Sequence, residues 1–211
     1  MKDLIIIILT FNLEEIVKPA RYLPKVCHFI NGKTMIEICL EKCLRLNPMK
    51  IILYVSKNNI QCINKVLKHS NYAKMLSFCI YDNELNGPRR LTIGQRCFRN
   101  KNLLILPGNC PLLSTKTLFR VISEGKNIKI QNNFFYLKKD SLNLLDKIDT
   151  LEVTDMQIVE METKQVETRG DLEDVEKFLE EMNVKKKKYF FSRDVRDRDR
   201  DKEKNDFKNN I

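Results

Sequence analysis

The 211-residue chain contains 43% hydrophobic and 31% charged residues, a balance typical of globular proteins and unlike that of disordered or membrane proteins. Its apolar run at residues 4–9 is far shorter than the roughly 20 residues of a membrane span and lacks the flanks of a signal peptide. Seven cysteines without a Cys-x-x-Cys pair argue against a disulfide framework or a zinc site. We therefore expect a cytoplasmic protein without a membrane anchor.

The net charge of +10 is unevenly distributed. Residues 185–211 contain eleven Lys and Arg against six Asp and Glu, and this surplus of five is half of the total. Arg and Asp alternate there without apolar periodicity, so we expect residues 184–211 to form a disordered tail. If the protein binds RNA, the counterion-release contribution should come from this tail.

Strands and helices are predicted to alternate through residues 1–183, which we expect to form one domain. Continuous apolar runs predict buried strands at residues 4–9, 51–55, 76–81, 103–106, 134–137 and 157–159. Apolar residues at helical spacing predict helices at about 35–44, 60–67, 115–122 and 171–181. Asn58 or Asn59, and Ser114 or Thr115, stand at expected helix N-caps. This order predicts an α/β fold with a mixed, mostly parallel sheet and helices on both faces.

Three segments carry a family resemblance. The sequence reads L-P-K-V at 23–26, followed by His28 and G-K-x-M at 32–35, then L-I-L-P-G-N-C-P-L-L at 104–113 and V-E-T-R-G-D-L at 166–172. In this order and near this spacing, they resemble motifs of the sugar-1-phosphate nucleotidyltransferases, closest to the bacterial N-acetylglucosamine-1-phosphate uridylyltransferases. The resemblance implies the three-layer, Rossmann-like fold of nucleotide-diphospho-sugar transferases. It also implies attack of a sugar 1-phosphate on UTP, giving a UDP-sugar and pyrophosphate.

Nucleotidyl transfer depends on positioning and on neutralising phosphate charge, because the sugar phosphate is itself the nucleophile. By the resemblance, Lys18 and Lys25 are the catalytic candidates that contact phosphates, and Leu9, Asn12 and Arg21 are candidates for nucleotide binding. The glycines of the family's phosphate loop are missing between the first strand and Lys25. A modified nucleotide loop and an ordinary connecting loop both remain open.

Base and sugar recognition have weaker counterparts. Gly87 stands where relatives recognise the uracil, but Pro88 follows it and lacks a backbone donor. Arg89 is a further candidate for nucleotide binding, or begins a helix. Asn132 resembles a sugar-binding asparagine of the family, although the surrounding sugar-binding region is shortened.

The resemblance places Asn109 and Glu167 at the two metal positions of the family, with carboxylate and amide exchanged. Mg²⁺ takes hard oxygen ligands and is usually held by one or two carboxylates together with phosphates and water, so the exchanged pair suits that ion. The alternative is that both are ordinary loop residues.

Two functional hypotheses follow. One is a uridylyltransferase of the UDP-N-acetylglucosamine pyrophosphorylase type, which takes a nucleoside triphosphate and a sugar 1-phosphate. The other is a catalytically inactive relative that binds a nucleotide or nucleotide sugar in a binding or regulatory role, because fold alone does not determine activity.

Overall fold

The computed structural model describes residues 3–10, 23–68, 76–81, 98, 100–131, 134–139, 141 and 164–182. The chain divides into two compact units, residues 1–168 and 169–211. The predicted strand at 157–159 and the predicted tail lie outside the described residues. In the second unit, the described part is a helix over residues 169–182, which confirms the predicted helix at 171–181.

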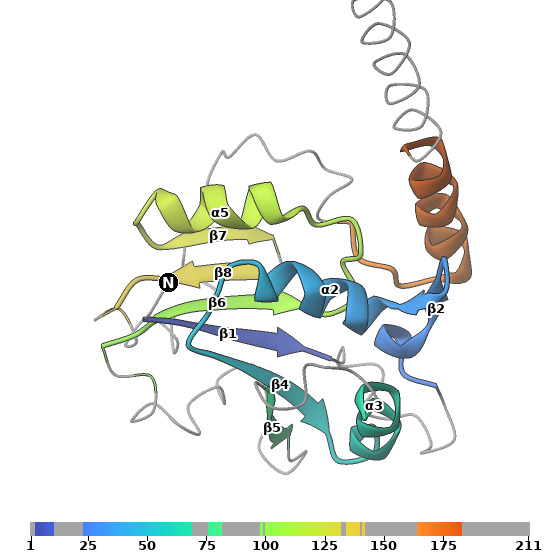
Figure 1. Ribbon diagram of the computed structural model, residues 1–211, viewed down its shortest axis with the longest axis horizontal. Coiled ribbons are helices and arrows are strands. Elements are labelled where there is room, and N and C mark those ends of the chain that lie inside the picture. Colours follow the sequence, from blue (N-terminus) through green and yellow to red (C-terminus); the bar gives the residue numbers. More distant parts are fainter. Residues whose placement is uncertain are drawn as a thin grey trace, which may run out of the picture. The chain divides into compact units, whose positions relative to one another are not determined.

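The described part of the first unit is built on a six-stranded sheet with the order β5-β4-β1-β6-β8-β7 (Figure 1). The strands are β1 (Leu4–Leu9), β4 (Lys50–Ser56), β5 (Leu76–Tyr81), β6 (Asn102–Pro107), β7 (Ile128–Gln131) and β8 (Phe134–Leu137). β1 pairs in parallel with β4 and β6, and β4 pairs in parallel with β5. β8 is antiparallel to β6 and to β7. The predicted α/β class with a mixed, mostly parallel sheet is thus confirmed.

The helices of this unit whose bounds lie within the described residues are α2 (Met35–Leu44), α3 (Ile60–Leu67) and α5 (Thr115–Ser123). A 3-10 turn, η1 (Lys25–Cys27), and a short hairpin of β2 (Phe29–Ile30) and β3 (Lys33–Thr34) precede α2.

The amino termini of these helices are capped in different ways. Thr34 caps α2 in a capping box, because its hydroxyl accepts from the Glu37 N–H while its own N–H donates to the Glu37 carboxylate at 2.9 Å. Ser114 caps α5 by accepting from the Thr117 N–H at 3.1 Å. Asn59 stands at the N-cap of α3 without a side-chain capping bond. The predicted cap positions 59 and 114 are therefore confirmed, but only Ser114 caps with its side chain.

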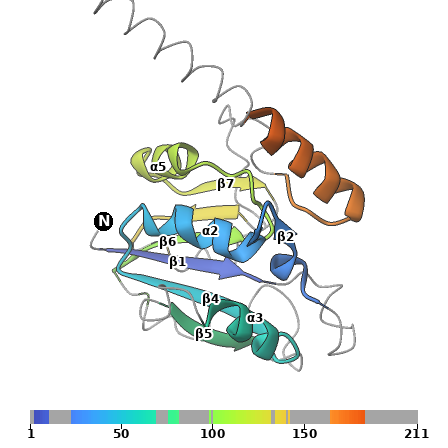
Figure 2. The ribbon, with the colours of Figure 1, turned by 45° about the vertical axis from the view of Figure 1, so that its right-hand side comes forward.

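β1 is buried on both faces, which explains its unbroken apolar sequence. Alternate residues Leu4, Ile6 and Ile8 pack in one cluster with side chains of α2, α3 and α5. In Figures 1 and 2, α2 lies over β1 and β6. Ile5 and Ile7 pack in a second cluster on the opposite face, which includes the helical residue Phe98. The two clusters hold the central strands in place and so fix where their carboxyl ends lie.

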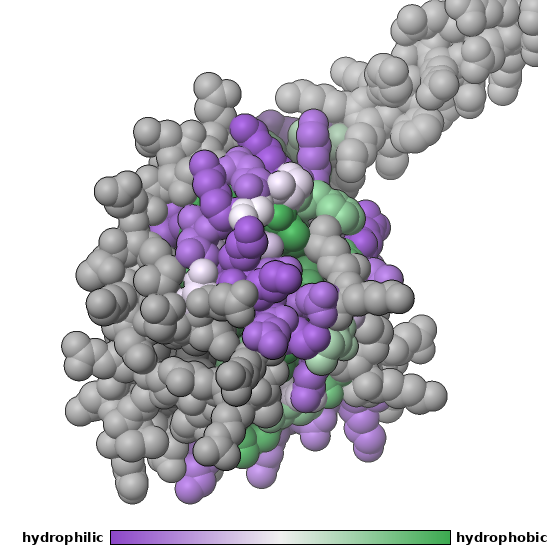
Figure 3. Space-filling model, turned by 90° about the vertical axis from the view of Figure 1, so that its left-hand side faces the viewer, coloured by the Kyte–Doolittle hydropathy of each residue, from purple (hydrophilic) through white to green (hydrophobic). Residues whose placement is uncertain are grey.

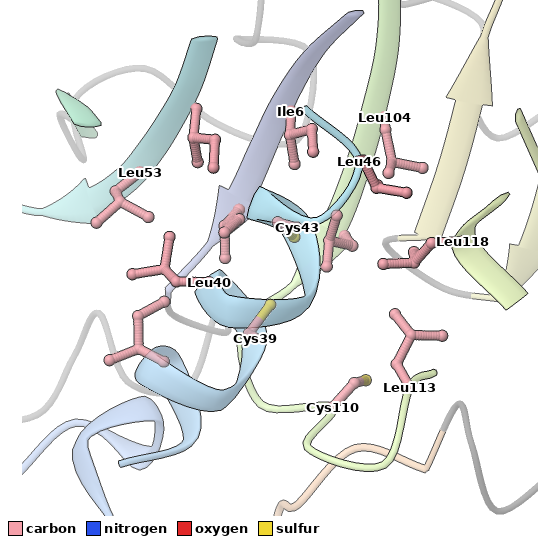
Figure 4. Close-up of a cluster of buried hydrophobic side chains, with 14 of the residues drawn as sticks. Ile6, Cys39, Leu40, Cys43, Leu46, Leu53, Leu104, Cys110, Leu113 and Leu118 are labelled. Carbon is pink, nitrogen blue, oxygen red and sulfur yellow. The ribbon is translucent and has the colours of Figure 1, made fainter. Parts of the chain in front are cut away.

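Four buried cysteines belong to the first of these clusters, and Figure 4 shows three of them: Cys39 and Cys43 on α2, and Cys110 after β6. We call these three the thiol cluster. A hydrogen bond with Cys39, and then burial, raise the pKa of the Cys43 thiol, while burial raises the pKa of the Cys110 thiol. These thiols pack as small apolar side chains and are poor nucleophiles.

The amino ends of the central strands lie at the edge of the sheet that faces the viewer in Figure 3. The described residues visible on that side in Figure 3 are mostly hydrophilic, with apolar ones between them. Asp3 and Lys101, just before β1 and β6, form an ion pair at 2.7 Å. The hydrogen bond from Lys101 lowers the pKa of the Asp3 carboxyl. Among the described helices, none is both long and apolar enough to cross a membrane.

Candidate functional site

The carboxyl ends of β1 and β6 lie side by side. Leu9 is in register with Pro107 of β6 and with Tyr54 of β4, so the segments that follow these strands leave from one edge of the sheet. The chain passes from β1 to β4 and β5 on one side and returns to β6 on the other. Ligands of open α/β sheets bind at such a reversal of strand order, outside the carboxyl ends of the strands.

Gly108 allows the loop after β6 to lie directly against β1. Its N–H donates to the Leu9 carbonyl at 2.8 Å. A Cβ at this position would meet the Val26 side chain at 3.1 Å, and both the Ile8 side chain and the Leu9 carbonyl at 3.2 Å. These distances are shorter than ordinary carbon contacts, so glycine is needed here for close packing.

Asn109 follows this contact and is 8% exposed. Its backbone carbonyl accepts from the Val166 N–H at 2.9 Å. Its side-chain Nδ2 donates to the Val166 carbonyl at 3.2 Å and to Glu167 Oε1 at 3.0 Å. One residue therefore attaches the segment at 166–167 to the carboxyl end of β6 through both its backbone and its side chain.

Lys25 reaches the same carboxylate from the other side. It opens η1, where its carbonyl accepts from the His28 N–H at 3.0 Å. Its ammonium forms an ion pair with Glu167 Oε2, and its side chain is 12% exposed, against 36% for that of Glu167. Lys25, Asn109 and Glu167 thus form one contact group at the carboxyl edge, which we call the edge cluster.

The edge cluster is close to electrically neutral. One ammonium is paired with one carboxylate, and the third member is an uncharged amide. Each carboxylate oxygen of Glu167 accepts from a different member, Oε1 from Asn109 and Oε2 from Lys25. The partial exposure of Glu167 leaves this neutral pair within reach of a ligand from solvent.

The side-chain oxygens of Asn109 and Glu167 suit a hard divalent cation only in part. A carboxylate and an amide oxygen suit Mg²⁺, with phosphate and water completing its shell. However, the carboxylate already has a cation beside it. Among the described residues, no group of three or more His, Cys, Asp and Glu side chains is placed to hold a metal ion. A metal at Glu167 would therefore need further oxygen ligands from phosphate or water.

The sequence motifs did not indicate two contacts that hold the chain in place at this edge of the sheet. The Lys42 ammonium of α2 donates to the Pro111 carbonyl and so anchors the loop that carries Asn109. Thr10 is completely buried, and its N–H and hydroxyl both donate to the Tyr54 carbonyl, at 3.1 Å and 2.9 Å. Thr10 therefore fixes the chain where it leaves β1. Neither residue stands in a recognisable motif, so no local signal identifies it.

The structure brings some of the predicted site residues together and does not describe others. Lys25, Asn109 and Glu167 are brought together in the edge cluster. Leu9 ends β1, and its carbonyl holds Gly108. The remaining candidates lie outside the described residues: Asn12, Lys18, Arg21, Gly87, Arg89 and Asn132.

Comparison with known proteins shows which sequences and folds the chain resembles. No protein-family model matches the sequence. A probable UDP-N-acetylglucosamine pyrophosphorylase of Acanthamoeba polyphaga mimivirus is 29% identical over 98 residues, which make up 46% of this chain and 38% of that relative. The match thus spans less than half of the relative's length.

Solved structures match over most of the chain. The 4-diphosphocytidyl-2C-methyl-D-erythritol synthase of Anaerococcus prevotii superposes with a TM-score of 0.56 at 12% identity, covering 85% of this chain and 99% of that one. Rv0371c of Mycobacterium tuberculosis gives 0.58 at 11% identity, covering 83% and 98%. A second structure of that mycobacterial protein, in complex with manganese, gives 0.50 at 12% identity, covering 72% and 77%. The chain shares the fold of these proteins.

Proposed function

We propose that the chain binds a nucleoside triphosphate or nucleotide sugar at the carboxyl edge of β1 and β6 and acts as a nucleotidyltransferase. The specific reaction proposed is that of a UDP-N-acetylglucosamine pyrophosphorylase, in which a sugar 1-phosphate and UTP give a UDP-sugar and pyrophosphate. The edge cluster is the observation that carries this proposal. Its members come from three separate motif segments and meet where such sheets bind ligands.

For this nucleotidyl transfer, the protein needs only to neutralise phosphate charge and to position the two substrates. The sugar phosphate supplies the attacking oxygen, so a Ser or Cys nucleophile is unnecessary, in keeping with a thiol cluster buried among apolar side chains. In this proposal the Lys25 ammonium offsets the negative charge of the triphosphate oxygens. Glu167 and Asn109 are the proposed holders of Mg²⁺, which when bound would neutralise phosphate charge.

A second candidate function is nucleotide or nucleotide-sugar binding without catalysis. It is favoured by the glycine-free sequence between β1 and Lys25, since glycines let backbone N–H groups approach a triphosphate closely. The compensated charge of Glu167 also favours it, because a neutral pair attracts a catalytic cation weakly.

The deciding experiment measures pyrophosphate release and UDP-sugar formation by the purified full chain with UTP, N-acetylglucosamine 1-phosphate and Mg²⁺. Lys25→Met keeps the length and aliphatic character of the side chain and removes its charge. It should lower kcat/KM by about 10²-fold or more, the range found when one charge-stabilising donor is lost. Lys33→Met is the matched control, because Lys33 forms an ion pair with Glu41 on an exposed surface of the same unit.

Calorimetric titration of UTP and of UDP-N-acetylglucosamine separates the two candidates. Binding with turnover supports the transferase. Binding without turnover supports the inactive relative, and neither ligand binding at millimolar concentration would reject both.

A further inference from the structure

We propose that Lys25 is a resident cation of the metal position: its ammonium holds Glu167 in the metal-free protein and releases it when a phosphate group binds. This inference rests on the proposed function, because it concerns the same site. It predicts that a divalent metal alone binds weakly, and that metal and phosphate ligand each strengthen the binding of the other.

The hydrogen-bonding of Glu167 supports this inference. Asn109 donates to one carboxylate oxygen and the Lys25 ammonium is paired with the other. Each carboxylate oxygen has a second lone pair, so a divalent ion could bind Glu167 beside these donors, but it would then lie close to the Lys25 ammonium. Asn109 carries no net charge and is held by two hydrogen bonds with the Val166 backbone, so it does not repel a cation. The Lys25 ammonium carries the like charge, so we expect Lys25 to be the partner that moves.

Repulsion between a divalent ion and the Lys25 ammonium makes their competition for Glu167 strong. A divalent ion on Glu167 would lie within about 4 Å of an ammonium that stayed in place, and like charges at that separation repel appreciably even with the screening of bulk water. The repulsion corresponds to at least about a tenfold loss of metal affinity. Removing the ammonium charge should therefore tighten metal binding, although it deletes a side chain of the ligand site.

The backbone around Lys25 is fixed while its ammonium can be redirected. The carbonyl of Lys25 is bonded to the His28 N–H, and the next two residues, Val26 and Cys27, are buried. A lysine side chain, by contrast, has a flexible stem and a compact charge without preferred planar geometry. A phosphate oxygen at this edge would compete with Glu167 for that charge. Glu167 would then be available to a metal, and by linkage the coupling acts equally in both directions.

The test measures Mn²⁺ binding to the full chain by electron paramagnetic resonance of the free ion. Lys25→Met should raise Mn²⁺ affinity at least about tenfold over wild type. Lys33→Met, which removes a lysine from an exposed ion pair elsewhere in the unit, should leave it unchanged. Adding Glu167→Gln to Lys25→Met should abolish the gain, which assigns it to this carboxylate. An unchanged or lower affinity in Lys25→Met would overturn the inference.

A second measurement uses wild type alone, so it does not depend on any variant folding. Inorganic phosphate should raise the Mn²⁺ affinity of wild type after subtraction of a protein-free titration, and Mn²⁺ should raise phosphate affinity by the same factor. Absence of coupling would overturn the inference even if UTP were turned over. Conversely, a gain in Lys25→Met together with coupling to phosphate, but without UTP or UDP-sugar binding, would support the resident cation and reject the proposed function.

Discussion

Gly108→Ala tests the packing that brings the loop after β6 against β1. The added Cβ meets the Val26 and Ile8 side chains and the Leu9 carbonyl at 3.1 to 3.2 Å. Val26 and Ile8 are almost completely buried, so neither can move into solvent. Overpacking of this kind costs about 1 to 3 kcal/mol, and the smaller entropy of the unfolded alanine chain offsets about 0.4 to 1 kcal/mol of that.

The free energy of unfolding should therefore fall by up to about 2.6 kcal/mol, with a central value of about 1.3 kcal/mol. For a chain of this size, that central value lowers Tm by about 3 to 5 °C. Calorimetry measures Tm, and urea unfolding measures the free energy. Adding Val26→Ala makes room for the new methyl group, so the double variant should lose less stability than the sum of the single variants. An unchanged Tm for Gly108→Ala, or strictly additive losses, would refute the packing argument.

Gly125→Ala provides a contrast, because the constraint there is the backbone. Gly125 has a φ of +63°, and a Cβ would meet nothing closer than 3.9 Å. Asparagine tolerates this conformation better than alanine, so Gly125→Asn should be more stable than Gly125→Ala. At Gly108, the larger asparagine should be worse than alanine. The opposite order at either position would contradict the assigned cause.

Three further predictions concern other parts of the chain. Thr34→Ala removes the capping box of α2 and should cost about 1 kcal/mol in urea unfolding, while an unchanged midpoint would show that the cap contributes nothing. Of the cysteines that the structure describes, iodoacetamide should modify the partly exposed Cys62 and Cys79 in native protein before the buried ones, and Cys79 only slowly, since burial raises the pKa of its thiol. The thiol cluster should react only after unfolding, and peptide mapping would reveal early modification. Truncation after Lys185 should leave Tm unchanged if residues 184–211 are a tail, whereas a fall above about 5 °C would show that they pack on the fold.

Local sequence predicted most of the described strands and helices, because long apolar runs and helical periodicity depend on burial alone. β7 was missed. Its sequence, I-K-I-Q, is only four residues long and alternates apolar with polar, too short for a reliable periodicity. Asn59, one of the two residues predicted as a cap, stands at the N-cap of α3 but makes no capping bond. Its φ of −101° and ψ of −13° are not the extended conformation that directs a side chain back to the helix.

The edge cluster was predicted residue by residue but not as a set of contacts. The motifs assigned Lys25 to phosphate and the pair Asn109 and Glu167 to a metal. The direct pairing of Lys25 with Glu167 depends on how segments 142 positions apart are brought together, which no local pattern encodes. Lys42 was missed for a related reason, since its bond to the Pro111 carbonyl joins residues 69 positions apart.

These separations also set the order in which the site can assemble. The sheet around β1 uses pairings with β4 and β6, all complete once residue 107 has been synthesised. The edge cluster additionally needs residues 166 and 167, so it can form only after a further stretch of chain has returned to β6. Closing a longer loop costs only about 0.6 kcal/mol for each doubling of its length, but such contacts form late in folding. A nascent chain would thus have its central sheet before it had its edge cluster, and the appearance of that cluster would show that the contacts of Glu167 with Lys25 and Asn109 had formed.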